Sequence, residues 1–132
     1  MSALHRRALL IVDHGTRSES ANQRFADFAT GIAEKRSDWL VTHAHMELAE
    51  PSFEVGIDRL AAQGAQEILV HLHFLGHGYH IRETIPELLE QARARHPQIC
   101  IQTTQPLGDD PRLVDIVLDR MQDHERLSEA EG

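Results

Sequence analysis

The chain has 132 residues, a length typical of one compact domain, and its 41% hydrophobic and 26% charged residues are those of a folded globular protein. Thirteen basic residues stand against twenty-one acidic ones, and the net charge of −8 disfavours binding to nucleic acid. The longest apolar run, residues 8–12, is too short to span a bilayer and no export signal is evident, so we expect a cytoplasmic protein without membrane contact.

Four short apolar runs bounded by turn residues predict strands at residues 8–13, 40–46, 67–74 and 98–103. Helical periodicity follows each run, over residues 19–36 and 51–63, from about 85, and from about 113. The chain becomes acidic and weakly periodic after Asp119. We therefore expect one domain over residues 1–124 and an acidic tail over 125–132.

A strand followed by a helix, four times over, is typical of a parallel sheet with right-handed crossovers. The sequence predicts an α/β fold, a flavodoxin-like four-stranded parallel sheet in the order 2-1-3-4 with helices on both faces. In such sheets ligands bind beyond the carboxyl ends of the strands, where the strand order reverses between the first and third strands.

Ten histidines are the unusual feature of the composition, because imidazole is the commonest metal ligand. His14 follows the first predicted strand, Glu47 follows the second and His80 lies in the loop after the third. These side chains should converge at one cleft and leave coordination positions open for a substrate. A histidine beside a glycine, such as His14, is also often only a helix cap or a polar loop residue.

Further histidines occupy alternate positions on the second and third predicted strands: His43, His45, His71 and His73. Two interpretations remain open for them. They are buried imidazoles bonded to backbone or water, or His45 and His73 form a polar layer that orients the metal ligands. His77, three residues before His80, shares its site if the loop is helical there.

Other cofactors are not expected. Cys100 is the single cysteine, so one chain cannot form an internal disulfide or hold an iron–sulfur cluster. The phosphate-binding pattern GxxxxGK[ST] is missing from the sequence, which gives no support for nucleotide binding.

Four segments, in order and in register from about Ala8 to Met121, resemble the short-form sirohydrochlorin chelatases of the class II tetrapyrrole metal chelatase family. They are LLIVDHGTRSESAN, HMELAEPS, QGAQEILVHLHFL with GYHIRETIPELL, and PLGDDPRL. The resemblance implies insertion of a divalent metal into sirohydrochlorin, without ATP: ferrous iron for sirohaem first, cobalt for cobalamin next, and also nickel. It also implies that the chain is one half of a two-lobed chelatase and forms a homodimer. The exposed edge of a short sheet independently favours such pairing.

The resemblance places His14, Glu47 and His80 at the catalytic metal site, and leaves open which is ligand and which is base. Two positions depart from the pattern of relatives. The residues before His80 read His-Gly-Tyr where many relatives have Pro-Gly-Arg, and Asp13 replaces a frequent glycine, which favours iron.

Sirohydrochlorin carries carboxylates, which an acidic protein binds only through local cations. Arg17 and Arg82 are predicted to contact them, with Thr16 and Ser18 donating hydrogen bonds. Because protonation of imidazole removes both ligand and base, activity should fall below about pH 6.

Two other functions compete with a chelatase. A histidine-rich metal carrier or sensor without catalysis would share these residues. A phosphohydrolase would need an arginine directly before His14, where the chain has Asp13.

Overall fold

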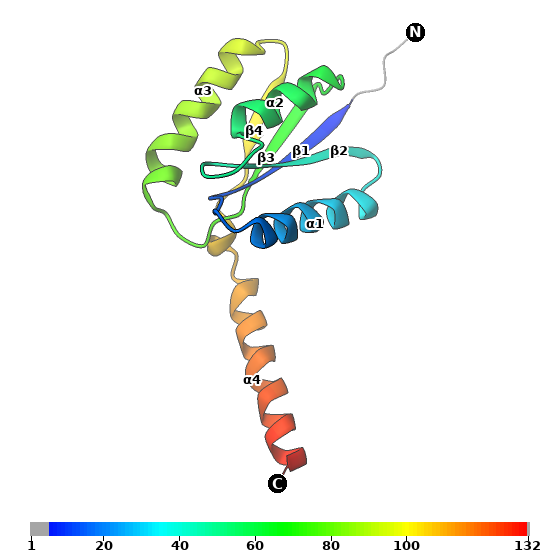
Figure 1. Cartoon of the computed structure of the whole chain (residues 1–132), viewed down its shortest axis with the longest axis vertical. Coiled ribbons are helices and arrows are strands. Elements are labelled where there is room, and N and C mark those ends of the chain that lie inside the picture. Colours follow the sequence, from blue (N-terminus) through cyan, green and yellow to red (C-terminus); the bar gives the residue numbers. More distant parts are fainter. Residues whose placement is uncertain (1–5, 132) are drawn as a thin grey trace.

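The computed structural model describes residues 6–131 and contains one parallel sheet of four strands in the order β2-β1-β3-β4, which confirms the predicted order (Figure 1). The strands are β1 (Arg7–Asp13), β2 (Trp39–His45), β3 (Glu67–Leu72) and β4 (Cys100–Thr103). β4 begins two residues later than predicted, because residues 97–99 are still in the turn that follows the preceding helix.

Helices cover both faces of the sheet. Helix α1 (Glu19–Lys35) packs over β1 and β2, and helices α2 (Phe53–Ala62) and α3 (Ile85–Arg95) pack on the opposite face. Ser18 and Ser52 cap α1 and α2 by accepting hydrogen bonds from the backbone N–H groups of Ala21 and Val55. A π-helical turn, His80–Thr84, leads directly into α3.

The two faces of the sheet are built differently. The face under α2 and α3 is mostly apolar, with a core that includes Leu10, Ile57, Leu60 and Val70, none of them exposed to solvent. The α1 face has a small apolar core around Ile11 and Phe25. Nearer the carboxyl ends of β1 and β2 that face carries polar side chains in place of apolar ones: Asp13, His43 and His45.

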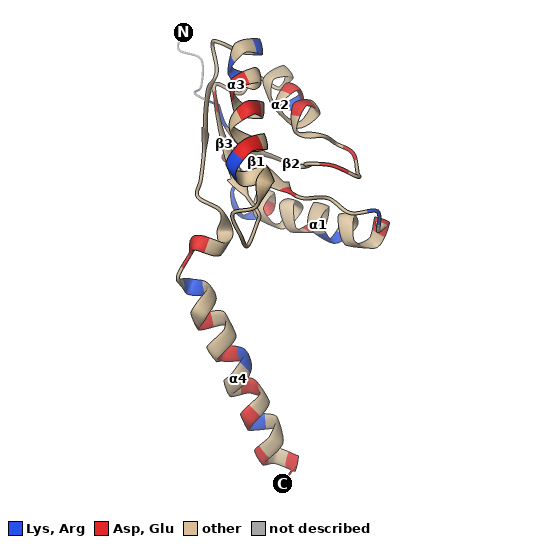
Figure 2. Cartoon of the chain, turned by 90° about the vertical axis from the view of Figure 1, so that its left-hand side faces the viewer, with Lys and Arg blue, Asp and Glu red and all other residues tan. Residues whose placement is uncertain are grey.

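Helix α4 (Arg112–Glu131) contradicts the expectation that the fourth helix completes a fourth strand–helix repeat against the sheet. It projects away from the body of the molecule and has no buried residue (Figures 1 and 2). A short 3₁₀ turn, Leu107–Asp109, aims the chain outward before the helix begins. The helix runs unbroken to Glu131, so residues 125–131 of the predicted acidic tail are helical. The division into a domain and a tail remains a prediction. In the part of the chain that the structure describes, no helix is both long and apolar enough to cross a membrane.

Candidate metal centre at the carboxyl ends of the strands

Three side chains from three separate loops meet beyond the carboxyl ends of β1, β2 and β3. The Nε2 atom of His14 lies 3.0 Å from Oε1 of Glu47, and Nε2 of His80 lies 3.5 Å from the same oxygen. The two imidazole rings are 4.9 Å apart between centroids. One potential ligand atom from each of the three lies within 4.8 Å of the others. The structure thus brings His14, Glu47 and His80 together as a triad.

Backbone pairing places Glu47 beside His14. The N–H of Met46 donates to the carbonyl of Asp13 at 2.9 Å, and the N–H of Glu47 donates to the carbonyl of His14 at 3.1 Å. The pairing of β1 with β2 therefore continues past the end of the sheet. Gly15 makes this possible, since its φ is +89° and a Cβ atom there would lie 1.9 Å from the carbonyl oxygen of Glu47.

His80 is held by the π-helical turn that it begins. The N–H of Ile85 bonds to the carbonyl of His80, and Nδ1 of the His80 ring lies 3.3 Å from the hydroxyl oxygen of Thr84. Such turns often mark functional sites because the wider ring of backbone bonds redirects a side chain. Here the turn and Thr84 together direct Nε2 of His80 at Glu47.

The contact between His14 and Glu47 requires a positive charge between the two side chains. Nδ1 of His14 lies 3.3 Å from the carbonyl oxygen of Gly15, which only accepts, so Nδ1 carries the proton. In the neutral ring, Nε2 then presents a lone pair to the Glu47 carboxylate. Two electron-rich atoms 3.0 Å apart need a positive charge between them, either a proton or a metal ion.

The spacing of the triad suits a metal ion. Donor atoms around one ion with bonds of roughly 2.1 Å lie about 3 to 3.5 Å apart, as the two nitrogen–oxygen pairs do. Two imidazoles and one carboxylate are a mixed set that accepts divalent ions of the first transition row. The side chains are 51%, 48% and 26% exposed for His14, Glu47 and His80, so a bound ion would keep positions open to a further ligand.

Asp13 and His45 form a second pair directly behind the triad. They are the last residues of β1 and β2 and oppose each other in the sheet register. Oδ1 of Asp13 lies 2.6 Å from Nδ1 of His45, whose side chain is only 1% exposed. Because each residue immediately precedes one of the paired loops, this contact ties together the bases from which His14 and Glu47 project. We interpret it as a positioning contact.

The other histidines of this face, His43, His71 and His73, are half-buried under or beside α1. Nε2 of His71 is 3.1 Å from Nδ1 of His73, and the rings of Phe25 and Phe28 lie against His73. Burial lowers the pKa of His43, His71 and His73, so these imidazoles stay neutral. His71 and His73 contact each other, and His43 lies against His45 and the ring of Phe25. An orienting role for His73 remains a prediction.

His77 does not share the site of His80, as the sequence analysis considered, but contacts Asp109. Its Nε2 lies 2.8 Å from Oδ1 of Asp109, in the 3₁₀ turn before α4, and it is not one of the three grouped ligands. The loop is not helical at His77, since the π-helical turn begins only at His80. His77 lies before the helical turn, so helical periodicity does not place its ring on the same side as the ring of His80.

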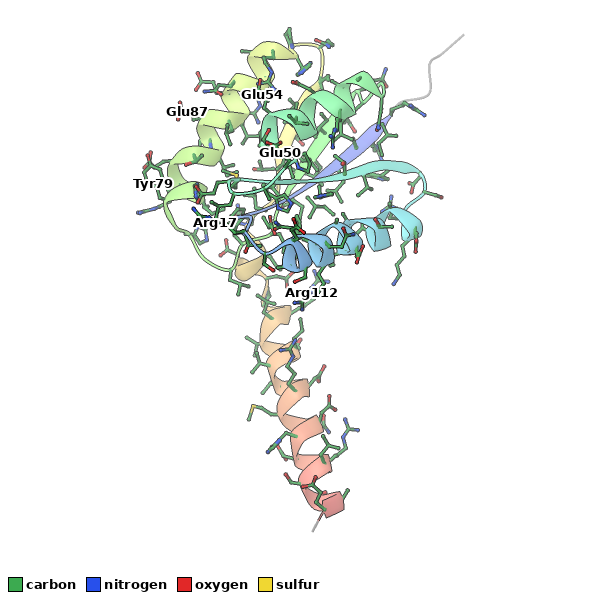
Figure 3. All side chains as sticks on the ribbon, in the orientation of Figure 1. Arg17, Glu50, Glu54, Tyr79, Glu87 and Arg112 are labelled. Carbon is green, nitrogen blue, oxygen red and sulfur yellow. The ribbon has the colours of Figure 1, made fainter. Side chains whose placement is uncertain are left out.

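The four predicted substrate contacts lie on the loop after β1, at the start of α1 and in the π-helical turn. Arg17 lines an open cavity of about 660 Å³ between the start of α1 and the loop after β2, and with Tyr79 it lies at the same end of the sheet (Figure 3). Arg82 is exposed within the π-helical turn. The hydroxyls of Thr16 and Ser18 take part in capping α1, where they accept from the N–H groups of Ser18 and Ala21. Substrate binding by these four residues remains a prediction.

Sequence reasoning missed the partners that hold the histidines at this end of the sheet. Thr84, Asp13 and Asp109 were not assigned contacts, although one signal was present for Asp13. Asp13 is the last residue of β1, as His45 is of β2, and the two-residue alternation puts both side chains on the same face of the sheet. Because β1 and β2 are adjacent and in register, these two residues oppose each other.

The fold and the triad define an α/β protein with an open histidine–carboxylate cluster, a candidate metal site, at the switch point of its sheet. The chain belongs to the CbiX family, whose pattern matches residues 8–124.

Curated and solved relatives agree with that membership. The chain is 38% identical over 124 residues to a chloroplastic sirohydrochlorin ferrochelatase of Arabidopsis thaliana, covering 94% of this chain and 54% of the relative. It is 31% identical over 128 residues to a sirohydrochlorin cobaltochelatase of Methanothermobacter thermautotrophicus, covering 86% and 89%. The crystal structure of the sirohydrochlorin chelatase SirB from Bacillus subtilis, in complex with cobalt, superposes with a TM-score of 0.81 at 35% identity, covering 89% of this chain and 50% of SirB. The chain thus spans about half the length of two of these three proteins.

Proposed function

We propose that this protein is a sirohydrochlorin chelatase, which inserts a divalent metal ion into the macrocycle without ATP. The observation that carries the proposal is the position of Glu47 Oε1 between the Nε2 atoms of His14 and His80, at 3.0 and 3.5 Å. Two relatives named as sirohydrochlorin chelatases are 38% and 31% identical to the chain, and SirB shares its fold.

Metal insertion exchanges two pyrrole protons for one divalent cation. The ion enters the macrocycle as a dication, two N–H bonds break, and two protons leave, so charge is conserved. The triad suits both halves of this exchange, because its nitrogen and oxygen lone pairs bind either a metal ion or a proton. Three ligands with open positions hold an ion weakly enough to release it, whereas a closed tetrahedral cage would retain it.

The surroundings of the triad suit a flat macrocycle with a charged rim. Leu48, Leu75 and Tyr79 are large apolar side chains exposed on the loops that flank the triad. Arg17 and Arg82 have no ion-pair partner among the described residues, which leaves both guanidinium groups able to bind carboxylates. Apolar surface would then contact the ring while the arginines contact its acidic substituents.

The metal substrate we propose is ferrous iron or cobalt, with nickel as a further candidate, because imidazole and carboxylate accept all three. We also propose that the chain works as a homodimer in the cytoplasm. The sequence resemblance implies a two-lobed chelatase built from two chains, and this chain spans about half the length of SirB. Cys100, a free and exposed thiol, is compatible with a reducing compartment.

The experiment is a spectrophotometric assay with purified protein, sirohydrochlorin, and ferrous or cobaltous ion under anaerobic conditions. We expect the macrocycle spectrum to change far faster than in buffer, and competition between the ions identifies the preferred metal. A metal carrier would bind the ion and leave the insertion rate unchanged, which would overturn the proposal. Static light scattering of the same sample tests the homodimer separately.

A further inference from the structure

Two histidines at the carboxyl end of β3 face each other at a distance that suits a shared metal ion. His71 lies in β3 opposite Ile11 of the α1 face, and His73 follows directly, with its N–H bonded to the carbonyl of Val12 at 2.8 Å. The two-residue alternation of a strand therefore puts both rings on that face. Nε2 of His71 lies 3.1 Å from Nδ1 of His73. Two nitrogens bound to one ion at about 2.0 to 2.1 Å are roughly 2.9 to 3.4 Å apart.

Packing does not explain this pair. In the part of the chain that the structure describes, the two imidazoles have no hydrogen-bonding partner except each other, and the rings of Phe25 and Phe28 lie 5.4 and 5.0 Å from the ring of His73. Buried strands normally present apolar residues at such positions. Neither histidine belongs to the triad.

The protonation state of the pair allows a metal ion to bind. Burial lowers the pKa of both His71 and His73, so both rings are neutral near pH 7 and each has one nitrogen with a lone pair. One proton lies between the two facing nitrogens. When that proton moves to the far nitrogen of its own ring, both facing nitrogens present lone pairs, and neither ring changes its charge.

An open cavity connects the pair with solvent. His71 lines a cavity of about 420 Å³ together with Thr104 at the end of β4 and with Asp109 and Asp110 before α4. The two carboxylates already have partners, since Asp109 contacts His77 and Asp110 contacts Arg112. Water from this cavity can therefore fill the coordination positions that the two imidazoles leave open.

The similar pair on β2 does not have this arrangement. The rings of His43 and His45 are 5.4 Å apart between centroids, but Nδ1 of His45 is engaged by Asp13 at 2.6 Å. His43 is half-buried on the same face of the sheet, and burial lowers its pKa as well. His43 therefore provides a matched control for His71 and His73.

We propose that His71 and His73 form a second metal site, which binds one divalent transition-metal ion through Nε2 of His71 and Nδ1 of His73, with water in the remaining positions. The donor atoms define the class of ion. Neutral imidazoles suit cobalt, nickel, copper and zinc, whereas magnesium and calcium prefer oxygen ligands. The site goes beyond the proposed chelation, because it requires neither the macrocycle nor the triad.

The first test measures cobalt binding by the full chain that carries His14→Ala and His80→Ala, which removes two triad ligands and leaves the pair intact. Equilibrium dialysis should give one cobaltous ion per chain, against two for the wild type. Adding His71→Gln or His73→Gln should weaken the remaining binding by roughly tenfold or more, because one of two protein ligands is lost. His43→Gln in the same background should bind cobalt as its parent does. Circular dichroism and thermal melting check that each variant is folded.

Nitrogen-15 NMR of the imidazole rings identifies the ligand atoms without a substitution in the pair. When zinc ion is added to the His14→Ala, His80→Ala protein, we expect the resonances of Nε2 of His71 and Nδ1 of His73 to shift and those of His43 to stay. A pair that serves only as a structural hydrogen bond would keep its resonances, and this result overturns the proposal.

The other outcomes also decide the question. Absence of bound cobalt in the His14→Ala, His80→Ala protein overturns the second site, as does binding that His71→Gln and His73→Gln leave unchanged. Equal weakening by His43→Gln would mean that the ion is not held by the pair, which overturns it too. The chelatase assay is separate: a chain that binds two ions without inserting metal overturns only the proposed function, and a chain that inserts metal but binds one ion overturns only the second site.

Discussion

The two faces of the sheet differ in composition: one holds most of the apolar core, and the other carries the polar residues behind the candidate metal site. Under α2 and α3 the strands present mostly apolar residues, and this face holds the main core, including Leu10, Ile57 and Val70. On the α1 face the apolar strand residues Leu9, Ile11 and Val41 stop short of the carboxyl ends of β1 and β2. Asp13, His43 and His45 occupy the carboxyl half, next to the loops that bear the triad.

This difference shows how a small domain places polar chemistry beside a stable core. Strands covered on both sides are normally apolar throughout, because a buried polar group without a partner is costly. Here the polar groups are partnered, as Asp13 is by His45, and lie where the strands end. The α2 and α3 face then stabilises a fold whose other face carries the site.

The sharpest test of the division is Glu47→Gln. It keeps the shape of the side chain and removes the charge that faces His14 and His80. We expect the insertion rate to fall by about 10²- to 10⁴-fold, the range for loss of a group that exchanges protons in the reaction, with no loss of folding stability. The chelatase assay and thermal melting measure the two effects. Glu54→Gln, in the exposed first turn of α2, is the control and should retain wild-type activity.

A matched pair of core substitutions tests how much each face of the sheet contributes to the free energy of unfolding. Val70 is fully buried under α2 and α3, while Val41 is partly buried at the edge of the small core under α1. Val70→Ala should lower the free energy of unfolding by about 2 to 4 kcal/mol and Val41→Ala by about 1 kcal/mol, because the same two methyl groups leave a larger unfilled cavity in the main core. Urea denaturation measures both. Equal losses would show that the faces contribute alike.

Asp13→Asn probes the contact that joins the two regions. It keeps a side chain able to bond His45 but removes the charge 2.6 Å from Nδ1. We expect cobalt affinity or the insertion rate to fall by about 10- to 100-fold, as for other groups that orient metal ligands. The visible absorbance of bound cobalt reports the ligand geometry. Asp27→Asn on the outer surface of α1 should leave that spectrum unchanged, and a wild-type spectrum for Asp13→Asn would contradict the positioning role.

The smallest expected effect is on the pH dependence of stability. Burial lowers the pKa of His43, His71 and His73 below 6.5 in the folded protein. As the pH falls below 6.5, the unfolded chain takes up protons that the folded chain does not, so stability decreases on acidification and is unaffected above about pH 7. The urea midpoint should therefore be lower at pH 5.5 than at pH 7.5.

A variant isolates this effect from other acid-sensitive groups. His71→Gln should lose less stability between the two pH values than the wild type, whereas His124→Gln on the exposed helix α4 should lose as much as the wild type. Identical losses for His71→Gln and the wild type would show that this histidine titrates alike in both states.

Much of the fold and of the triad was predictable because both follow from local pattern and chain topology. Apolar runs alternating with helical periodicity indicate a parallel sheet, and the order 2-1-3-4 was confirmed. The rule that ligands bind where the strand order reverses then selected the loops of His14, Glu47 and His80, which the structure brings together. Contacts such as His80 with Thr84 and His77 with Asp109 were not predictable, because they depend on a π-helical turn and a 3₁₀ turn that periodicity does not reveal.

The amino-acid sequence by itself determined which segments are strands and helices, their order in the sheet, and which three loops supply donor atoms, since these depend on spacing along the chain. Only the tertiary structure decided that one carboxylate oxygen lies between two imidazole nitrogens and that α4 projects away from the body instead of packing on the sheet. The reason is that an apolar stripe predicts that one side of a helix is buried. Which surface packs against that side depends on the direction that the linker gives the helix.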